Sequence, residues 1–185
     1  MSIYSKIIDY QKLDKAWDRV RKNKPAAGVD GITYEQFDEG KKGEILQLHK
    51  ELKEHNYHSL PVKLVTIYRG EKARVIALYS MRDKVLQQSL AEELGKIYDK
   101  RFSRQTYAYR PEKSALAGIE DINEKIKSGR FECFLKVDIS KYFDTIRWNS
   151  LQAILRQSIP EEDVIELIRE CSCSVSLDEV TGELE

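Results

Sequence analysis

The sequence predicts an α+β fold that is mostly helical and contains one small antiparallel sheet. Apolar residues recur at helical spacing in several separate segments of the 185-residue chain. Two strand-like segments, 62–69 and 73–78, flank a turn at Gly70 and read as a hairpin. No apolar run reaches the roughly 18 residues needed to cross a bilayer, so a transmembrane helix is not expected. At 41% hydrophobic and 34% charged residues, the chain has the composition of a soluble globular protein.

The N-terminal third predicts two helices. The first spans residues 7–20, because its apolar residues follow a helical period: Ile8, Leu13, Trp17 and Val20. Thr33 and Gln36 have the spacing of a capping box, so a second helix begins there. We expect this helix to break near Gly40, resume, and end near His55.

After the hairpin, Ser80 is placed to cap a long helix with its apolar face running from Val85 to Ile97. Residues 101–113 have no regular period and predict a loop. A helix over 114–126 and an apolar strand over 131–137 follow. The last elements expected are helices over 148–155 and 160–168, with Pro160 at the first helical position, and a hairpin from Cys173 with its turn at 178–182.

Charge and cysteine content indicate the setting. The formal net charge is zero, but residues 1–114 hold 23 Lys/Arg against 16 Asp/Glu, and residues 115–185 hold 8 against 15. A basic N-terminal part and an acidic C-terminal part are compatible with a nucleic-acid-binding face beside a metal site. They are equally compatible with an uneven scatter of surface charge. Three cysteines do not make a disulfide framework, and the first residues are not a signal peptide, so a reducing cytoplasm is expected.

The segment that carries chemistry is the apolar run ending at Asp138. A buried strand would hold this carboxylate rigidly, and Mg²⁺ prefers hard oxygen ligands of that kind. Taken alone, an aspartate after a strand is more often a cap or turn residue. Phe143 follows five positions later, and by itself it reads as a core aromatic.

The pattern Val-Asp-Ile-x-x-x-Phe-Asp over residues 137–144 resembles the first catalytic motif of reverse transcriptases. The resemblance implies that Asp138 binds two Mg²⁺ ions and that the Ile139 backbone carbonyl contributes a ligand. It also implies that Phe143 packs under the incoming sugar and rejects a 2′-hydroxyl. Asp144 resembles a second acidic position common in the group II intron lineage.

Two earlier segments extend the resemblance. Residues 27–37 resemble the N-terminal extension of group II intron reverse transcriptases, and residues 62–78 resemble the fingers hairpin. The resemblance to the fingers hairpin implies that Arg74 is the first candidate to bind the nucleotide triphosphate and Lys72 the second. A guanidinium suits this role because its paired donors match the oxygens of a phosphate. Relatives of intron maturases carry two prolines after this arginine, and both are absent here. The alignment of this segment with the family motif is therefore open by one or two residues.

Residues 81–88 and 102–114 complete the resemblance. The first resembles the helix that follows the hairpin, where Arg82 would support the template or the fingers fold. The second resembles the family segment Phe-Ser-x-x-Ser-Tyr-Gly-Phe-Arg-Pro. Basic and aromatic residues alternate here, a pattern suited to phosphate contacts beside stacking surfaces. The candidate nucleic-acid contacts are Arg101, Arg104, Tyr107, Tyr109, Arg110 and Lys113.

The resemblance implies a right-hand polymerase fold, with the N-terminal extension and fingers in residues 1–113 and an incomplete palm in 114–185. No Tyr-x-Asp-Asp or Pro-Gln-Gly motif occurs in the sequence. We therefore expect a truncated RNA-directed DNA polymerase that does not polymerise by itself. Its partners would be an RNA template, a DNA or RNA primer and deoxynucleoside triphosphates, with no membrane.

Three points stay open at this stage. The chain could instead be a non-catalytic RNA-binding module derived from a reverse transcriptase, or an assembly domain whose fingers pair with another subunit. A homodimer is a further candidate assembly. The motifs do not separate intron, diversity-generating, CRISPR-associated and defence subgroups.

Overall fold

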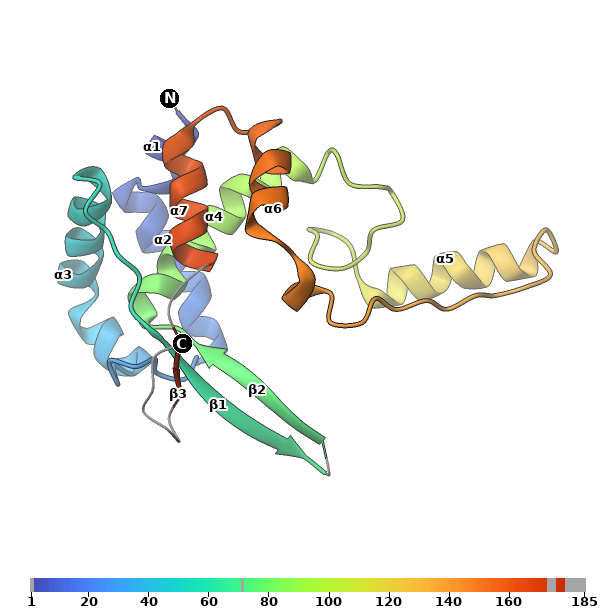
Figure 1. The fold of residues 1–185 in the computed structure, drawn as a ribbon, viewed down its shortest axis with the longest axis horizontal. Helices are drawn as coiled ribbons and strands as arrows, with labels where there is room; N and C mark the ends of the chain where they lie inside the picture. The colour runs from blue at the N-terminus through green and yellow to red at the C-terminus, as the bar shows by residue number, and fades with distance from the viewer. Residues whose placement is uncertain (1, 71, 173–175, 179–185) are drawn as a thin grey trace. The chain divides into compact units, whose positions relative to one another are not determined.

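The computed structural model describes residues 2–70, 72–172 and 176–178, and within them the chain is mostly helical with one small sheet, which confirms the predicted fold class (Figure 1). The chain divides into two compact units. One is formed by Met1–Glu93 and Ile154–Glu185, and the other by Leu94–Ala153. No helix in the described residues combines the length and apolar character needed to cross a bilayer.

The N-terminal helix prediction is wrong in one respect, because two helices replace one. Helix α1 spans Ile3–Ile7 and α2 spans Tyr10–Val20, and the short 3-10 helix η1 follows at Arg21–Asn23. Asp9 separates α1 from α2: its carboxylate accepts a hydrogen bond from the Lys12 N–H at 3.1 Å and so caps a new helix.

Helix α3 spans Tyr34–Lys53 and begins with the predicted capping box between Thr33 and Gln36. The break expected near Gly40 is wrong, because the helix runs through it. A helical glycine costs only about 1 kcal/mol, and the buried face of α3, which includes Phe37 and Leu48, outweighs that cost. Trp17 of α2 meets Phe37 with ring centroids 4.4 Å apart, and its Nε1–H donates to Asp38 Oδ1 at 2.6 Å.

Helix α4 spans Met81–Tyr98, α6 spans Trp148–Arg156 and α7 spans Glu162–Ser172. Ser80 caps α4 as predicted, since its Oγ accepts from the Asp83 N–H at 3.2 Å. The predicted start of α7 at Pro160 is two residues early. The carboxylate of Glu161, the residue before α7, accepts hydrogen bonds from the Ile3 and Tyr4 N–H groups at 2.7 and 2.8 Å and thereby caps α1.

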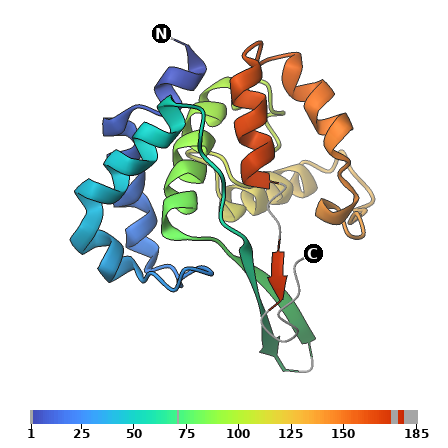
Figure 2. The same ribbon diagram turned by 60° about the vertical axis from the view of Figure 1, so that its left-hand side comes forward.

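The sheet has the order β2-β1-β3. Strands β1 (Val62–Arg69) and β2 (Lys72–Leu78) form the predicted antiparallel hairpin, which extends away from the helices of its unit (Figure 2). Strand β3 (Ser176–Asp178) pairs parallel with the start of β1. The hairpin expected at the end of the sequence lies outside the described residues apart from this short strand.

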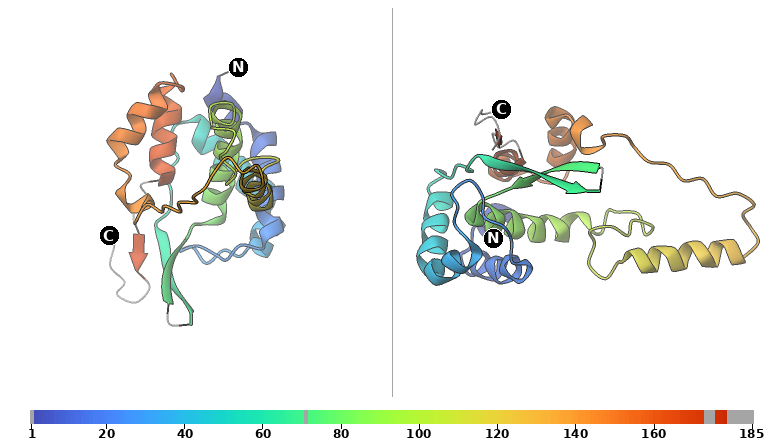
Figure 3. Two further views of the ribbon diagram at one scale, coloured as in Figure 1. Left: turned by 90° about the vertical axis from the view of Figure 1, so that its right-hand side faces the viewer. Right: turned by 90° about the horizontal axis from the view of Figure 1, so that it is seen from below.

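In the second unit, a loop over 101–113 and helix α5 (Ala115–Lys127), capped by Ser114, match the sequence predictions. The chain reverses after α5 (Figure 3). The strand predicted over 131–137 is wrong: these residues are exposed and have no regular structure. A strand needs a neighbour for its backbone hydrogen bonds, and no described residue pairs with this segment. The 3-10 helix η2 follows at Phe143–Thr145.

Candidate functional site

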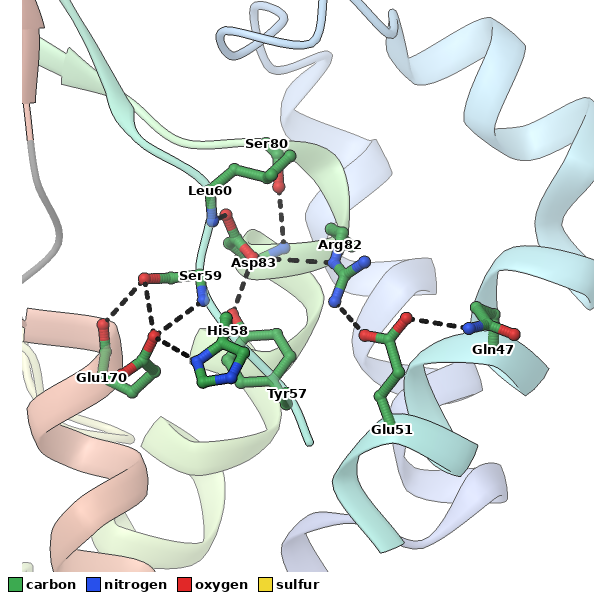
Figure 4. A network of polar contacts seen from close by, with 10 residues as sticks. All are labelled: Gln47, Glu51, Tyr57, His58, Ser59, Leu60, Ser80, Arg82, Asp83 and Glu170. Carbon is green, nitrogen blue, oxygen red and sulfur yellow. Dashed lines mark hydrogen bonds and ion pairs between the residues drawn. The ribbon is translucent and has the colours of Figure 1, made fainter. Parts of the chain in front are cut away.

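The base of the hairpin is held by one buried carboxylate (Figure 4). Asp83 on α4 is 1% exposed and accepts hydrogen bonds from the Tyr57 hydroxyl at 2.7 Å and the Leu60 N–H at 3.2 Å. Leu60 lies just before β1, and α4 begins just after β2. Asp83 therefore ties both ends of the hairpin to the helices. Burial and the Asp83 charge raise the pKa of the Tyr57 hydroxyl, which stays protonated and donates.

Neighbouring contacts extend this network in two directions. Ser59 donates from its N–H to Glu170 Oε1 on α7 at 3.0 Å, which fixes the chain leading into β1. On the other side, Arg82 forms an ion pair with Glu51 of α3 and lies over the Tyr57 ring, with 5.3 Å from Cζ to the ring centroid. The Arg82 side chain is only 23% exposed. Its charge is thus paired within the fold, which agrees with the fold-supporting role that is one of the two expected for Arg82.

The register of the hairpin sorts its charges. Opposed residues of an antiparallel pair share a face, and successive residues alternate faces. Ile67 pairs with Arg74, and the same face carries Lys63, Arg69 and Val65. The other face carries only uncharged residues: Leu64, Thr66, Tyr68, Ala73, Val75 and Ala77. Arg74 is exposed on the basic face. Lys72 begins β2, and its side chain lies outside the described residues.

The basic and aromatic residues of the 101–113 loop divide into an inner and an outer group. In the inner group, Arg110 donates from Nε to Asp99 Oδ1 at 2.7 Å, and its side chain is 11% exposed. This hydrogen bond from the guanidinium is the main cause that lowers the pKa of the Asp99 carboxyl. Tyr107 packs over Gly118 of α5, where an added Cβ would come within 3.2 Å of the ring, and Lys113 Nζ lies 5.3 Å from the centre of that ring.

The outer group points to solvent. Arg101 and Arg104 are exposed, and Tyr109 is fully exposed, at 101%. Tyr109 has a φ of 56°, in the left-handed region that non-glycine residues seldom adopt. An exposed aromatic ring can stack on a base, and exposed guanidinium groups of the same loop can contact phosphates.

Residues 137–143 of the predicted catalytic motif are all exposed. Asp138 lies in irregular backbone rather than at the end of a strand, and Ile139 is 62% exposed. Phe143 is 77% exposed and meets Tyr142 edge to face, with ring centroids 5.3 Å apart. The reading of Phe143 as a core aromatic does not hold. A cavity of about 370 Å³ lies between the end of α5 and residues 131–135, lined mainly by apolar side chains.

The comparison with family models identifies one family. The model of the reverse transcriptase (RNA-dependent DNA polymerase) family matches residues 68–183, which is more than half of the chain. The chain belongs to the reverse transcriptase family. The matched range includes every candidate site residue from Lys72 to Phe143.

The chain is also similar to individual relatives. It is 26% identical to the putative COX1/OXI3 intron 2 protein of Saccharomyces cerevisiae, over 88% of this chain and 18% of that protein. It is 26% identical to protein YkfC of Escherichia coli, over 76% and 38%, and 26% identical to the group II intron-encoded protein LtrA of Lactococcus lactis, over 83% and 25%. The chain thus spans less than two fifths of the length of these relatives.

Reverse transcriptases use divalent metal, and the described residues do not by themselves fit a pair of ions. The carboxylate of Asp138 has the chemistry that Mg²⁺ prefers. However, the residues that the structure describes contain no group of three His, Cys, Asp or Glu side chains that could hold a metal ion.

Several residues that matter here were missed by sequence reasoning. No sequence pattern singles out Asp83, Tyr57, Asp99 or Gly118. Eleven positions separate Asp99 from Arg110, a spacing that corresponds to no helical or strand period. At Gly28 an added Cβ would lie 2.5 Å from the Ser80 backbone nitrogen, so this glycine allows close packing. Only the glycine itself was visible as a signal.

Proposed function

We propose that the chain supplies the fingers and the first catalytic aspartate of a group II intron-like reverse transcriptase, an enzyme that synthesises DNA on an RNA template. The observation that carries this proposal is the family match over residues 68–183, which contains the end of β1 and all of β2, the basic aromatic loop and Asp138 in order. Relatives that are named as intron proteins support the lineage.

Roles follow from chemistry and exposure. Asp138 and the Ile139 carbonyl would be ligands for Mg²⁺, and Phe143 would lie under the sugar of the deoxynucleoside triphosphate. Arg74 and Lys72 would bind its phosphates. The basic face of the hairpin, shared by Arg74 with two further basic residues, supports a polyanionic ligand there.

The outer residues of the loop, Arg101, Arg104 and Tyr109, would contact the template or primer, because their side chains are exposed. Arg82 Nη2, the Arg110 guanidinium, the Lys113 amine and the ring of Tyr107 already make contacts within the protein. We assign these four the role of supporting the interface rather than touching the nucleic acid.

We further propose that these 185 residues bind a primed RNA template without extending it, since two Mg²⁺ ions need more carboxylates than Asp138 provides. The proposal includes a reducing, cytoplasmic setting, which is supported by Cys133 and Cys171 being free thiols. The proposed function requires neither a membrane nor a homodimer.

The test is binding and extension with an RNA template annealed to a DNA primer. The chain should bind, and replacing Arg101 and Arg104 together with alanine should weaken binding and reduce the dependence of log Kd on log salt by about 0.7 for each lost phosphate contact. Asp138→Asn should leave binding unchanged in the absence of divalent metal. With Mg²⁺ and deoxynucleoside triphosphates, no primer extension is expected.

Two results would contradict the proposal. A chain that does not bind primed template at low salt has no role in templated synthesis of the kind proposed. Primer extension that Asp138→Asn abolishes would show a complete metal site within these residues, against the claim that they hold only one of its carboxylates.

A further inference from the structure

The Arg110 guanidinium makes more hydrogen bonds than any single phosphate contact would need. Its Nε donates to Asp99 Oδ1 at 2.7 Å and its Nη2 donates to the Asp99 carbonyl at 2.9 Å. Its Nη1 donates to the Ser103 carbonyl at 2.8 Å and to the Thr106 carbonyl at 3.3 Å. Every nitrogen of the side chain therefore has an acceptor, and the side chain is 11% exposed.

The acceptors and their donor span the loop. Asp99 follows the end of α4, Ser103 and Thr106 form the first turn of the loop, and Arg110 itself is near the end of the loop. One rigid planar fork thus joins the start and the end of the loop. The Phe102 ring lies 5.8 Å from Arg110 Cζ and covers a further side of the guanidinium.

The outer residues lie on the backbone that this fork holds. Arg104 lies between the two carbonyl acceptors, and its own carbonyl accepts from Lys113 Nζ at 3.4 Å. Tyr109 immediately precedes Arg110 and has the left-handed φ of 56°. A strained backbone of this kind costs about 1–3 kcal/mol and persists only where its surroundings fix it. The hydrogen bonds of Arg110 provide that restraint at the neighbouring residue.

We propose that Arg110 is a positioning residue for nucleic-acid binding: it sets the loop so that Arg104 and Tyr109 face the template, and it makes no phosphate contact of its own. This inference rests on the proposed function, because it concerns the same interface. A direct contact would require the guanidinium to exchange its hydrogen bonds to Asp99, Ser103 and Thr106 for bonds to phosphate. Asp99 also already balances its charge.

A double-mutant cycle separates positioning from contact. The affinity for the primed RNA template is measured for Arg104→Ala, Arg110→Ala and the double variant, with Arg130→Ala as a control for loss of an exposed positive charge in the same unit. If Arg110 acts through Arg104, the fold-loss of affinity caused by Arg104→Ala should be at least threefold smaller in the Arg110→Ala background than in the wild type. Two direct phosphate contacts would instead give multiplying losses.

Two further readouts complete the design. Arg110→Lys keeps the charge but not the planar fork, so it should bind as weakly as Arg110→Ala. Hydrogen exchange of the backbone amides of residues 103–113 should quicken at least tenfold in both Arg110 variants and stay unchanged in Arg104→Ala, while amides of α2 and α3 stay protected in all of them.

The outcomes are distinct. Multiplying losses, wild-type affinity in Arg110→Lys, or unchanged exchange in the loop of Arg110→Ala would each overturn the positioning role. Absence of binding by the wild-type chain would instead count against the proposed function, and loop exchange in the free protein would still report whether Arg110 holds the loop.

Discussion

Replacing Asp83 with alanine should destabilise the unit that contains the hairpin by about 3–5 kcal/mol. The substitution leaves two donors without an acceptor: the Tyr57 hydroxyl, whose residue is 7% exposed, and the Leu60 N–H, which is part-buried. A hydrogen bond to a charged group is worth about 1.5–3 kcal/mol, and a buried donor that loses its acceptor retains the full cost of its desolvation. Native domains are stable by only about 5–15 kcal/mol, so the loss should be large.

Urea unfolding followed by circular dichroism measures this loss as a shift of the midpoint at constant slope. Tyr57→Phe is the matched control, since it removes one donor and should cost about 1.5 kcal/mol. The double variant should lose less stability than the sum of the losses in the two single variants. The reason is that the hydroxyl left without an acceptor by Asp83→Ala is absent from the double variant. An Asp83→Ala variant within about 0.5 kcal/mol of the wild type, a range typical of surface substitutions, would refute the reasoning.

The remaining predictions concern packing, pH and thiol chemistry. Gly28→Ala should lower the melting temperature, because its Cβ would lie 2.5 Å from the Ser80 backbone nitrogen, just before α4. Gly43→Ala is the control and should raise the melting temperature, because nothing lies within 4 Å of its Cβ. Equal shifts of the melting temperature in the two variants would contradict this. Burial raises the pKa of the Glu161 carboxyl, but the hydrogen bonds from the N–H groups of α1 together outweigh burial, so the net pKa is lowered. Its stabilisation should therefore be complete above the unfolded pKa of about 4.3 and vanish as pH falls through the folded pKa, so urea midpoints of wild type and Glu161→Gln should converge in acid; a constant gap would exclude this. Burial raises the pKa of the Cys171 thiol to about 12, so mapped iodoacetamide labelling at neutral pH should modify exposed Cys133 and spare Cys171 until urea unfolds the chain; equal labelling would count against the buried position.

Features that depend on neighbouring residues were the ones that the sequence predicted well. Thr33 and Gln36 satisfy each other across three positions, Ser80 caps its own helix, and Gly70 marks a hairpin whose two strands adjoin it. Local stereochemistry decides each of these, whatever the rest of the chain does.

Features that depend on distant partners were predicted less well. Residues 131–137 have the composition of a strand, but strand structure also needs a paired neighbour, and none of the described residues provides one. The capping of α1 by Glu161 joins residues more than 150 positions apart, so no local pattern could show it. Likewise, the sequence shows that Arg110 is basic but not that Asp99 and the loop carbonyls already occupy its donors.

The segregation of charge on the hairpin also limits how its length can vary. Side chains alternate faces along a strand, so inserting one residue into β2 between Lys72 and Arg74 would shift the pairing by one and move Arg74 to the uncharged face. Inserting two residues would shift the pairing by two and keep Arg74 on the basic face. Among natural variants and engineered loops of this hairpin, tolerated length changes within a strand should therefore come in even numbers.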